Sequence, residues 1–266
     1  MRGHLGVAVV ILCLISALGV SAQTPGQQVE IKAGLHYNYL LYLPQGYESG
    51  GKPWPFILFL HGAGERGSQL SLVKAHGPPK VVANSSLMQK VFGAAGCPFI
   101  VVSPQCPANE WWLNEYLTPV LQDVLAKYSI DRKRMYMTGL SMGGFGTWSY
   151  ASEFPDLFAA IIPISGGANA MDIASGYTTL KIPAAKLENL GHVPIWCFHG
   201  RDDTTVPPAL DEKAVKAVQA IGGNAFYTLY WSTGHDAWTR TYDKPFIYPW
   251  LLTHVKSSVN AWSDYR

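Results

Sequence analysis

Continuous apolar segments recur along the chain, separated by stretches long enough for helices. They cover residues 56–60, 98–103, 135–138, 159–164, 194–198 and 225–230. An apolar run without polar alternation is typical of a strand that is covered on both faces. The pattern therefore predicts an α/β protein with a mostly parallel central sheet and helices on both faces.

The residues before these segments predict an N-terminal antiparallel hairpin. Residues 29–32 and 37–43 have strand-like composition, and Gly34 lies between them. Pro44 and Gly46 follow as turn residues. The sheet is thus expected to begin with antiparallel strands and to continue as a parallel one.

Helical spacing of apolar residues predicts helices over residues 117–128, 211–221 and 248–255. The segment 165–193 has no strong pattern and is longer than a usual connection, so it could carry a small cap. No linker, repeat or low-complexity tract divides the chain. We therefore expect residues 23–266 to form one domain.

The first 22 residues have the features of a secretory signal peptide. A charged start at Arg2 is followed by an apolar run over 5–20 and a small-residue exit ending at Ala22. Cleavage there would make Gln23 the first residue of a secreted or periplasmic protein. The alternative is an uncleaved membrane anchor, because the run is close to the length of a membrane span.

The net charge limits the partners that we expect, and the cysteine positions predict free thiols. The formal net charge is +2 without a basic block, so we expect neither a nucleic-acid partner nor a stable membrane association after signal cleavage. Cys97 and Cys106 bracket a predicted strand, whose length exceeds the span of a disulfide. Together with Cys197 they are expected to be buried free thiols.

A nucleophilic serine is predicted within the apolar pattern. Gly139, Ser141 and Gly143 form a G-x-S-x-G motif directly after the strand-like run 135–138. Glycines on both sides allow a sharp turn from which the serine hydroxyl projects beyond the sheet. This context favours a nucleophile over a chance match.

A serine hydroxyl needs a histidine base and a carboxylate that orients it. His235 follows the predicted strand at 225–230, in a Gly-His loop, and is the best base. Asp202 and Asp203 follow the strand at 194–198 and compete for the acid role. The rival histidines are His61, His76, His199 and His254.

The developing oxyanion needs two hydrogen-bond donors, which backbone amides can provide. One is expected from Met142, directly after the nucleophile. The other is expected from the loop 61–64 after the first apolar strand, where Ala63 is preferred over Gly62. This chemistry requires no metal ion and no organic cofactor.

These stretches resemble secreted α/β-hydrolases of the carboxylesterase group called predicted peptidases, related to feruloyl-esterase-like and polyhydroxybutyrate-depolymerase-like enzymes. The resemblance rests on residues 60–67, 76–80, 103–107, 111–112, 139–143, 234–238 and 250–252. It implies an α/β-hydrolase fold with the triad order Ser, Asp, His.

The similarity of the turn H-G-x-x-D-x-x-V-P to the acid loop of such esterases favours Asp203 and leaves Asp202 to cap the turn. By the same resemblance, an ion pair of Glu65 and Arg66 would stabilise the oxyanion loop. Trp112 would line the substrate pocket, or else pack in the core, and His76 would be structural more often than substrate-binding.

The sequence thus predicts a serine carboxylesterase. An uncovered pocket predicts short-chain or aromatic acyl esters, either small molecules or linked to polysaccharide. One alternative is a serine peptidase resembling prolyl oligopeptidases, although no propeller-sized region precedes the motifs. The other is a catalytically silent binding protein on a hydrolase scaffold.

Overall fold

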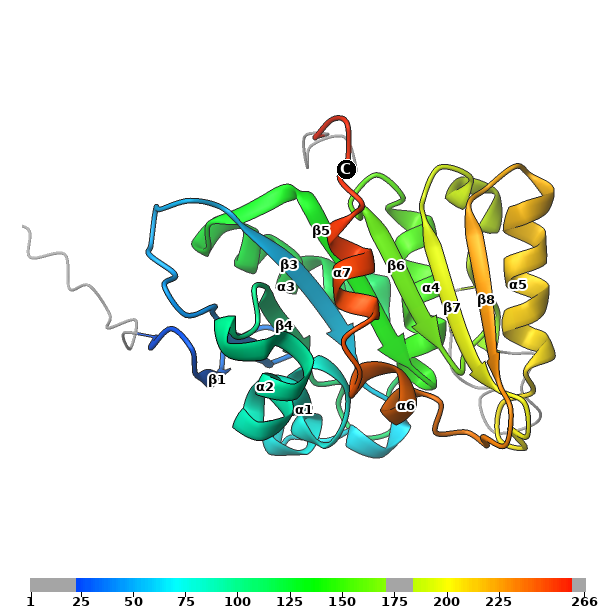
Figure 1. Cartoon of the computed structure of the whole chain (residues 1–266), viewed down its shortest axis with the longest axis horizontal. Coiled ribbons are helices and arrows are strands. Elements are labelled where there is room, and N and C mark those ends of the chain that lie inside the picture. Colours follow the sequence, from blue (N-terminus) through cyan, green and yellow to red (C-terminus); the bar gives the residue numbers. More distant parts are fainter. Residues whose placement is uncertain (1–22, 171–183, 260–266) are drawn as a thin grey trace, which may run out of the picture.

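The computed structural model describes residues 23–170 and 184–259. In these residues the chain forms an eight-stranded sheet with the order β1-β2-β4-β3-β5-β6-β7-β8 (Figure 1). The strands are β1 (Gln28–Ile31), β2 (Tyr39–Tyr42), β3 (Trp54–Leu60), β4 (Ile100–Pro104), β5 (Ile130–Leu140), β6 (Ala160–Ile164), β7 (Ile195–Gly200) and β8 (Ala225–Tyr230).

The strand directions confirm the predicted sheet. The hairpin partners β1 and β2 are antiparallel, and β2 also pairs antiparallel with β4. All remaining neighbours, from β4 through β3 to β8, pair in parallel. The carboxyl ends of these parallel strands therefore meet at one edge of the sheet, where ligands bind in open α/β sheets.

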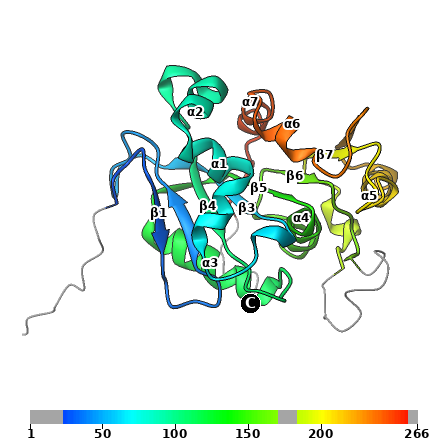
Figure 2. The ribbon, with the colours of Figure 1, turned by 90° about the horizontal axis from the view of Figure 1, so that it is seen from below.

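Helices cover both faces of the sheet (Figure 2). One face packs against α3 (Asn114–Lys127), α4 (Met142–Glu153) and α5 (Ala209–Ala220). The other packs against α1 (Gly77–Ala83), α2 (Ser85–Phe92), α6 (Trp238–Tyr242) and α7 (Ile247–Leu252). Each face has its own cluster of buried apolar side chains, which explains why the inner strands β2, β3, β4, β6 and β7 are apolar without alternation. The edge strand β8 differs from the prediction, because it is only partly buried and Phe226 is exposed.

The element boundaries depart from the prediction in a few places. The last predicted helix, 248–255, ends at Leu252, and α1 and α2 were not predicted. Both short helices begin near turn residues that obscure a helical pattern: Pro78 and Pro79 lie in the first turn of α1, and Asn84 caps α2 by accepting a bond from Leu87 N–H.

Several predictions concern parts of the chain that the structure does not describe. The predicted signal peptide at 1–22 lies outside the described residues, and so does part of the segment predicted to carry a cap, at 171–183. Within the described ranges, none of the helices has the length and apolarity needed to cross a membrane. Cys97, Cys106 and Cys197 are buried free thiols, as predicted.

Candidate active site

Ser141 occupies the sharp turn between β5 and α4. Its backbone angles, φ 51° and ψ −118°, lie outside the regions that residues with a side chain favour. The turn is held because Ser141 N–H donates to the carbonyl oxygen of Ile164 on β6 at 2.9 Å. The strained conformation lifts the serine to the carboxyl edge of the sheet, as a nucleophile elbow does.

The two glycines of the motif are required by close packing. A Cβ on Gly139 would collide with the carbonyl group of Gly143. A Cβ on Gly143 would collide with the carbonyl group of Leu60, at the end of β3. The glycines therefore bring α4 against the strands, so that the serine can turn out of the sheet.

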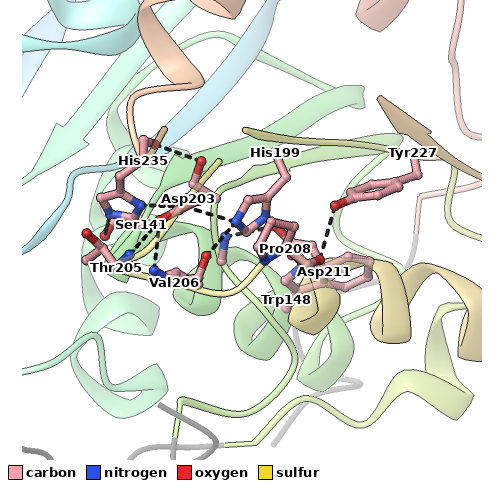
Figure 3. Close-up of polar contacts among 12 residues, drawn as sticks. Ser141, Trp148, His199, Asp203, Thr205, Val206, Pro208, Asp211, Tyr227 and His235 are labelled. Atoms are coloured by element: carbon pink, nitrogen blue, oxygen red, sulfur yellow. Dashed lines mark hydrogen bonds and ion pairs between the residues drawn. The ribbon is translucent and has the colours of Figure 1, made fainter. Parts of the chain in front are cut away.

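The structure brings the three predicted triad residues into one hydrogen-bonded chain (Figure 3). His235 Nε2 lies 2.8 Å from Ser141 Oγ, and His235 Nδ1 lies 2.7 Å from Asp203 Oδ2. The residues follow β5, β7 and β8, so the parallel sheet itself places them together. The rival histidines His61, His76 and His254 contact other groups.

The two candidate aspartates differ in burial and in backbone donors. Asp202 is exposed, whereas Asp203 is buried. Asp203 Oδ1 accepts bonds from the N–H groups of Thr205 and Val206 at 2.8 and 2.9 Å. Burial alone would raise the pKa of Asp203, but hydrogen bonds from His199, His235 and Val206 hold it well below its usual range, so it stays ionised.

The loop that carries His235 is anchored by a residue that sequence analysis missed. Ser165, which follows β6, donates its hydroxyl to the carbonyl oxygen of His235 at 3.0 Å. The indole of Trp238 meets the His235 ring edge-on, with centroids 5.0 Å apart. Ser165 also has a positive φ of 50°. Only the pairing of β6 with its neighbours brings it near His235, so no sequence signal marks it.

Residues 61–65, called the oxyanion loop because the sequence predicts that they hold the second oxyanion donor, lie beside the elbow. Gly62 N–H is engaged, because it donates to Glu65 Oε2 at 2.9 Å. Ala63 begins a single 3₁₀ turn and Met142 begins α4, and the first N–H groups of a helix have no partner within it. Both residues line the cavity at Ser141. This arrangement supports Ala63 over Gly62 as the second donor.

His61 connects this loop to the core as a neutral ring. Its Nδ1 lies 2.6 Å from Gly62 O, and its Nε2 accepts a bond from Cys106 N–H at 3.0 Å. Burial lowers the pKa of His61 to about 4, so the ring carries no charge at neutral pH. The indole of Trp112 donates to the His61 carbonyl at 3.0 Å and completes the support.

Glu65 and Arg66 stabilise the loop separately and not as the expected ion pair. Arg66 donates to the carbonyl oxygens of Ala63 and Glu110 at 3.0 and 3.1 Å. Glu65 holds Gly62 and lies 3.7 Å from His76 Nε2. Glu65 and Arg66 were expected to pair with each other, but each side chain bonds to backbone groups.

The cavity beside Ser141 has a volume of about 330 Å³ and is mostly apolar. Trp111, not the predicted Trp112, lines it, together with Leu140, Met142, Phe145, Val206 and Trp238. Trp112 is fully buried beneath the oxyanion loop, where its indole N–H donates to the backbone carbonyl oxygen of His61. The volume is near the lower end of the ~300–1,000 Å³ typical of ligand pockets.

His199 and Asp211 form a buried polar pair behind the acid turn, which comprises residues 201–206. His199 contacts both Asp203 and Asp211, and Asp211 extends from α5. Asp211 is the first residue of the predicted helix 211–221. Acidic side chains are common in the first turn of a helix, so the sequence did not mark Asp211 as part of the site. Within the described ranges, no cluster of three or more His, Cys, Asp or Glu side chains is arranged to hold a metal ion.

The sheet order and the nucleophile elbow define an α/β-hydrolase fold. Residues 33–243 match the family described as "Putative esterase". Because this match covers most of the sequence, the chain belongs to that esterase family.

Individual relatives agree with this assignment. A stretch of 115 residues is 36% identical to poly(3-hydroxyalkanoate) depolymerase C of Paucimonas lemoignei, covering 36% of this chain and 27% of that protein. A crystal structure of a thermostable esterase is 30% identical with a TM-score of 0.69, over 86% of this chain and 63% of that one. The chain thus matches about a quarter of the depolymerase and less than two thirds of the thermostable esterase.

A more distant structure shares the fold alone. The ferulic acid esterase AmCE1/Fae1A of the anaerobic fungus Anaeromyces mucronatus is 14% identical with a TM-score of 0.60. The similarity covers 86% of this chain and 89% of that one. The architecture is therefore conserved along almost the whole length of both chains.

Proposed function

We propose that the protein is a serine carboxylesterase with the triad Ser141, His235 and Asp203. The observation that carries the proposal is the hydrogen-bonded chain from Ser141 Oγ through His235 to Asp203, at the tip of a strained elbow. Membership of an esterase family supports ester bonds as the target. The backbone N–H groups of Ala63 and Met142 would form the oxyanion hole.

The proposed reaction transfers an acyl group first to the serine and then to water. Ser141 Oγ attacks the ester carbonyl carbon while its proton passes to His235 Nε2, 2.8 Å away. The resulting oxyanion accepts bonds from the two amides, and Asp203 stabilises the imidazolium. As the tetrahedral intermediate collapses, the alcohol leaves with that proton, and an acyl ester remains on Ser141.

Water then replaces the alcohol in the same geometry. His235 takes a proton from the attacking water, and the second tetrahedral intermediate expels Ser141 with that proton. The carboxylic acid product is released, and the resting hydrogen bonds are restored. Every step uses the side chains and amides already assembled, so no cofactor takes part in the proposal.

Cavity size and lining support small or aromatic acyl groups. About 330 Å³ between Trp111, Phe145 and Trp238 suits an acetyl, butyryl or phenylpropenoyl group better than a long chain. The names of the depolymerase and the ferulic acid esterase also refer to ester substrates. We propose short-chain or aromatic esters, free or linked to polysaccharide, and export of the protein by the signal peptide at 1–22.

Activity on p-nitrophenyl acetate and butyrate tests the proposal. We expect turnover by the wild-type protein, covalent labelling of Ser141 by a fluorophosphonate, and loss of both in Ser141→Ala. Ser86→Ala, at an exposed serine, is the matched control and should behave as wild type. Absence of both turnover and labelling in the wild type would contradict the enzyme proposal and favour a binding protein.

A substrate panel then separates the ester classes from the peptidase alternative. Methyl ferulate, acetylated xylan, p-nitrophenyl butyrate, a long-chain triglyceride and a proline-containing peptide are compared by kcat/KM. The proposal predicts the highest values for the short or aromatic esters. A preference for the triglyceride would overturn the acyl assignment, and a preference for the peptide would overturn the esterase assignment.

A further inference from the structure

His199 is completely buried behind the acid of the triad (Figure 3). It lies near the end of β7, with its ring directed between the acid turn and α5. Its Nε2 lies 3.1 Å from Asp203 Oδ2 and 3.0 Å from Val206 O. Its Nδ1 lies 2.8 Å from Asp211 Oδ2. Asp203 Oδ2 is therefore shared between His199 and His235.

The surrounding hydrogen bonds assign a proton to each ring nitrogen of His199. Asp211 Oδ1 accepts a bond from the indole of Trp148 at 2.7 Å, and Asp211 Oδ2 accepts one from Gly166 N–H at 2.8 Å. Asp203 Oδ1 likewise accepts two backbone bonds. Both carboxylates act as acceptors, and the third partner is a carbonyl. Each nitrogen of His199 must therefore donate, which only the imidazolium can do.

The charges around the ring favour the same protonation state. Burial alone lowers the pKa of His199, but the hydrogen bonds to Asp203 and Asp211 more than compensate and raise it to about 9. Tyr227 of β8 and Cys197 of β7 also lie near this cluster, and burial raises the pKa of both, so they stay uncharged. Glu212, next to Asp211 on α5, adds a further acidic group on the same side. The cation thus lies between two carboxylates.

On the far side of Asp203, the base of the triad has few charged neighbours. His235 faces Ser141 and Asp203, and Glu65 lines the same cavity. A carboxylate beside a histidine favours the imidazolium and raises its pKa, whereas a nearby cation opposes this. Without His199, two uncompensated carboxylates would lie behind a base that must be neutral to accept the serine proton.

We propose that His199 is a positioning residue that acts on His235 through Asp203. As an imidazolium it holds the shared Oδ2 oxygen and offsets part of the charge of Asp203 and Asp211. Asp203 then orients His235 while less of its negative charge acts on the ring of the base. The inference rests on the proposed function, because it assigns His235 as the base.

His199→Gln tests the proposal, since glutamine keeps a hydrogen-bond donor and removes the charge. The lower pKa of the kcat/KM profile on p-nitrophenyl acetate should rise by about one pH unit, as expected for losing a nearby cation. Activity should recover above this pKa, which a merely structural defect would not produce. His192→Gln is the matched control, because His192 forms an exposed pair with Asp156 and should leave the profile unchanged.

Nuclear magnetic resonance of protein with ¹⁵N-labelled histidine gives a second test that needs no turnover. In the wild type, His199 should carry protons on both ring nitrogens at pH 7, and the pKa of His235 should rise in His199→Gln. A single ring proton on His199, or an unshifted pKa of His235, overturns the inference. Failure of ester hydrolysis in the wild type would instead contradict the proposed function, so the two failures are distinguishable.

Discussion

The oxyanion loop contains one fully buried histidine and the acid turn packs against another, and one ring is neutral whereas the other is a cation. His61 is surrounded by backbone groups that fix one neutral tautomer, and burial lowers its pKa to about 4. His199 lies between Asp203 and Asp211, and its pKa rises to about 9. The two histidines are equally buried but their pKa values shift in opposite directions, because the groups that hydrogen-bond to each ring decide its charge.

This difference matches what each region does in the proposed mechanism. The oxyanion loop must present neutral dipoles to a developing negative charge, so its support needs only fixed geometry. The acid turn must hold a charge permanently in the interior, so it needs a compensating cation as well as backbone donors. A geometric role for the loop and an electrostatic role for the turn lead to different effects of substitution.

The largest effect is expected at the acid turn from Asp203→Asn. The amide would direct a donor at the ring nitrogens of His235 or His199, and the correct tautomer of the base would be lost. kcat should fall by roughly 10³–10⁴-fold, by analogy with acid-to-amide changes in other triads. Asp202→Asn, at the exposed neighbour, is the control. Comparable losses in both variants would contradict the assignment of the acid.

The two histidines should give opposite slopes of stability against pH. Between pH 4 and 6.5 the unfolded chain binds a proton that folded His61 does not, so stability rises with pH, by up to about 3 kcal/mol. From pH 6.5 to 9, folded His199 keeps a proton that the unfolded chain loses, so stability falls.

Urea unfolding over this pH range checks both slopes. His61→Gln should remove most of the rise below pH 6.5, and His199→Gln should remove the fall above it. Each variant is expected to leave the other slope in place. If either substitution changed both slopes, or neither, the comparison of the two histidines would be wrong.

A smaller effect is expected in the oxyanion loop from Glu65→Ala. The change removes the oxygen that accepts the bond from Gly62 N–H, so Ala63 is held less exactly. kcat should fall about tenfold, with little change in KM or in the lower pKa of the pH profile. Glu65→Gln keeps an acceptor oxygen and should retain most of the activity. A shift of the pH profile would argue for a charge role instead.

The smallest effect is expected from Ser165→Ala, which removes the hydroxyl bond to the His235 carbonyl. Losing one neutral hydrogen bond at the edge of the site should lower kcat/KM by roughly two- to fivefold. Ser152→Ala removes a buried hydroxyl far from the elbow and should leave kcat/KM unchanged. Equal activity of wild type and Ser165→Ala would show that the loop is held without this bond.

The sequence predicted the parts of the structure that local patterns control. Apolar runs indicated the parallel strands, and the turn motif predicted the elbow at Ser141, which the structure places at the end of β5. The sites that sequence analysis missed depend on long-range packing. Asp211 and Ser165 contact the site across 12 and 70 positions of chain, through helix docking and strand order.

The exchange of Trp112 for Trp111 has the same kind of cause. The two tryptophans are adjacent in sequence and both are buried, but the indole of Trp112 donates to the His61 carbonyl while Trp111 lines the cavity, a difference that only tertiary packing decides. Similarly, Glu65 and Arg66 have complementary charges but are turned towards different backbone groups. The local sequence thus indicated which residues belong to the site, but only the packed structure shows which groups they contact.

Mass spectrometry of the enzyme, quenched during turnover of p-nitrophenyl butyrate, tests most directly whether Ser141 is the nucleophile. We expect one butyryl group per chain on the peptide that contains Ser141, and none in Ser141→Ala. Acylation of another residue, or rapid hydrolysis without any covalent intermediate, would contradict the central claim that Ser141 is the nucleophile.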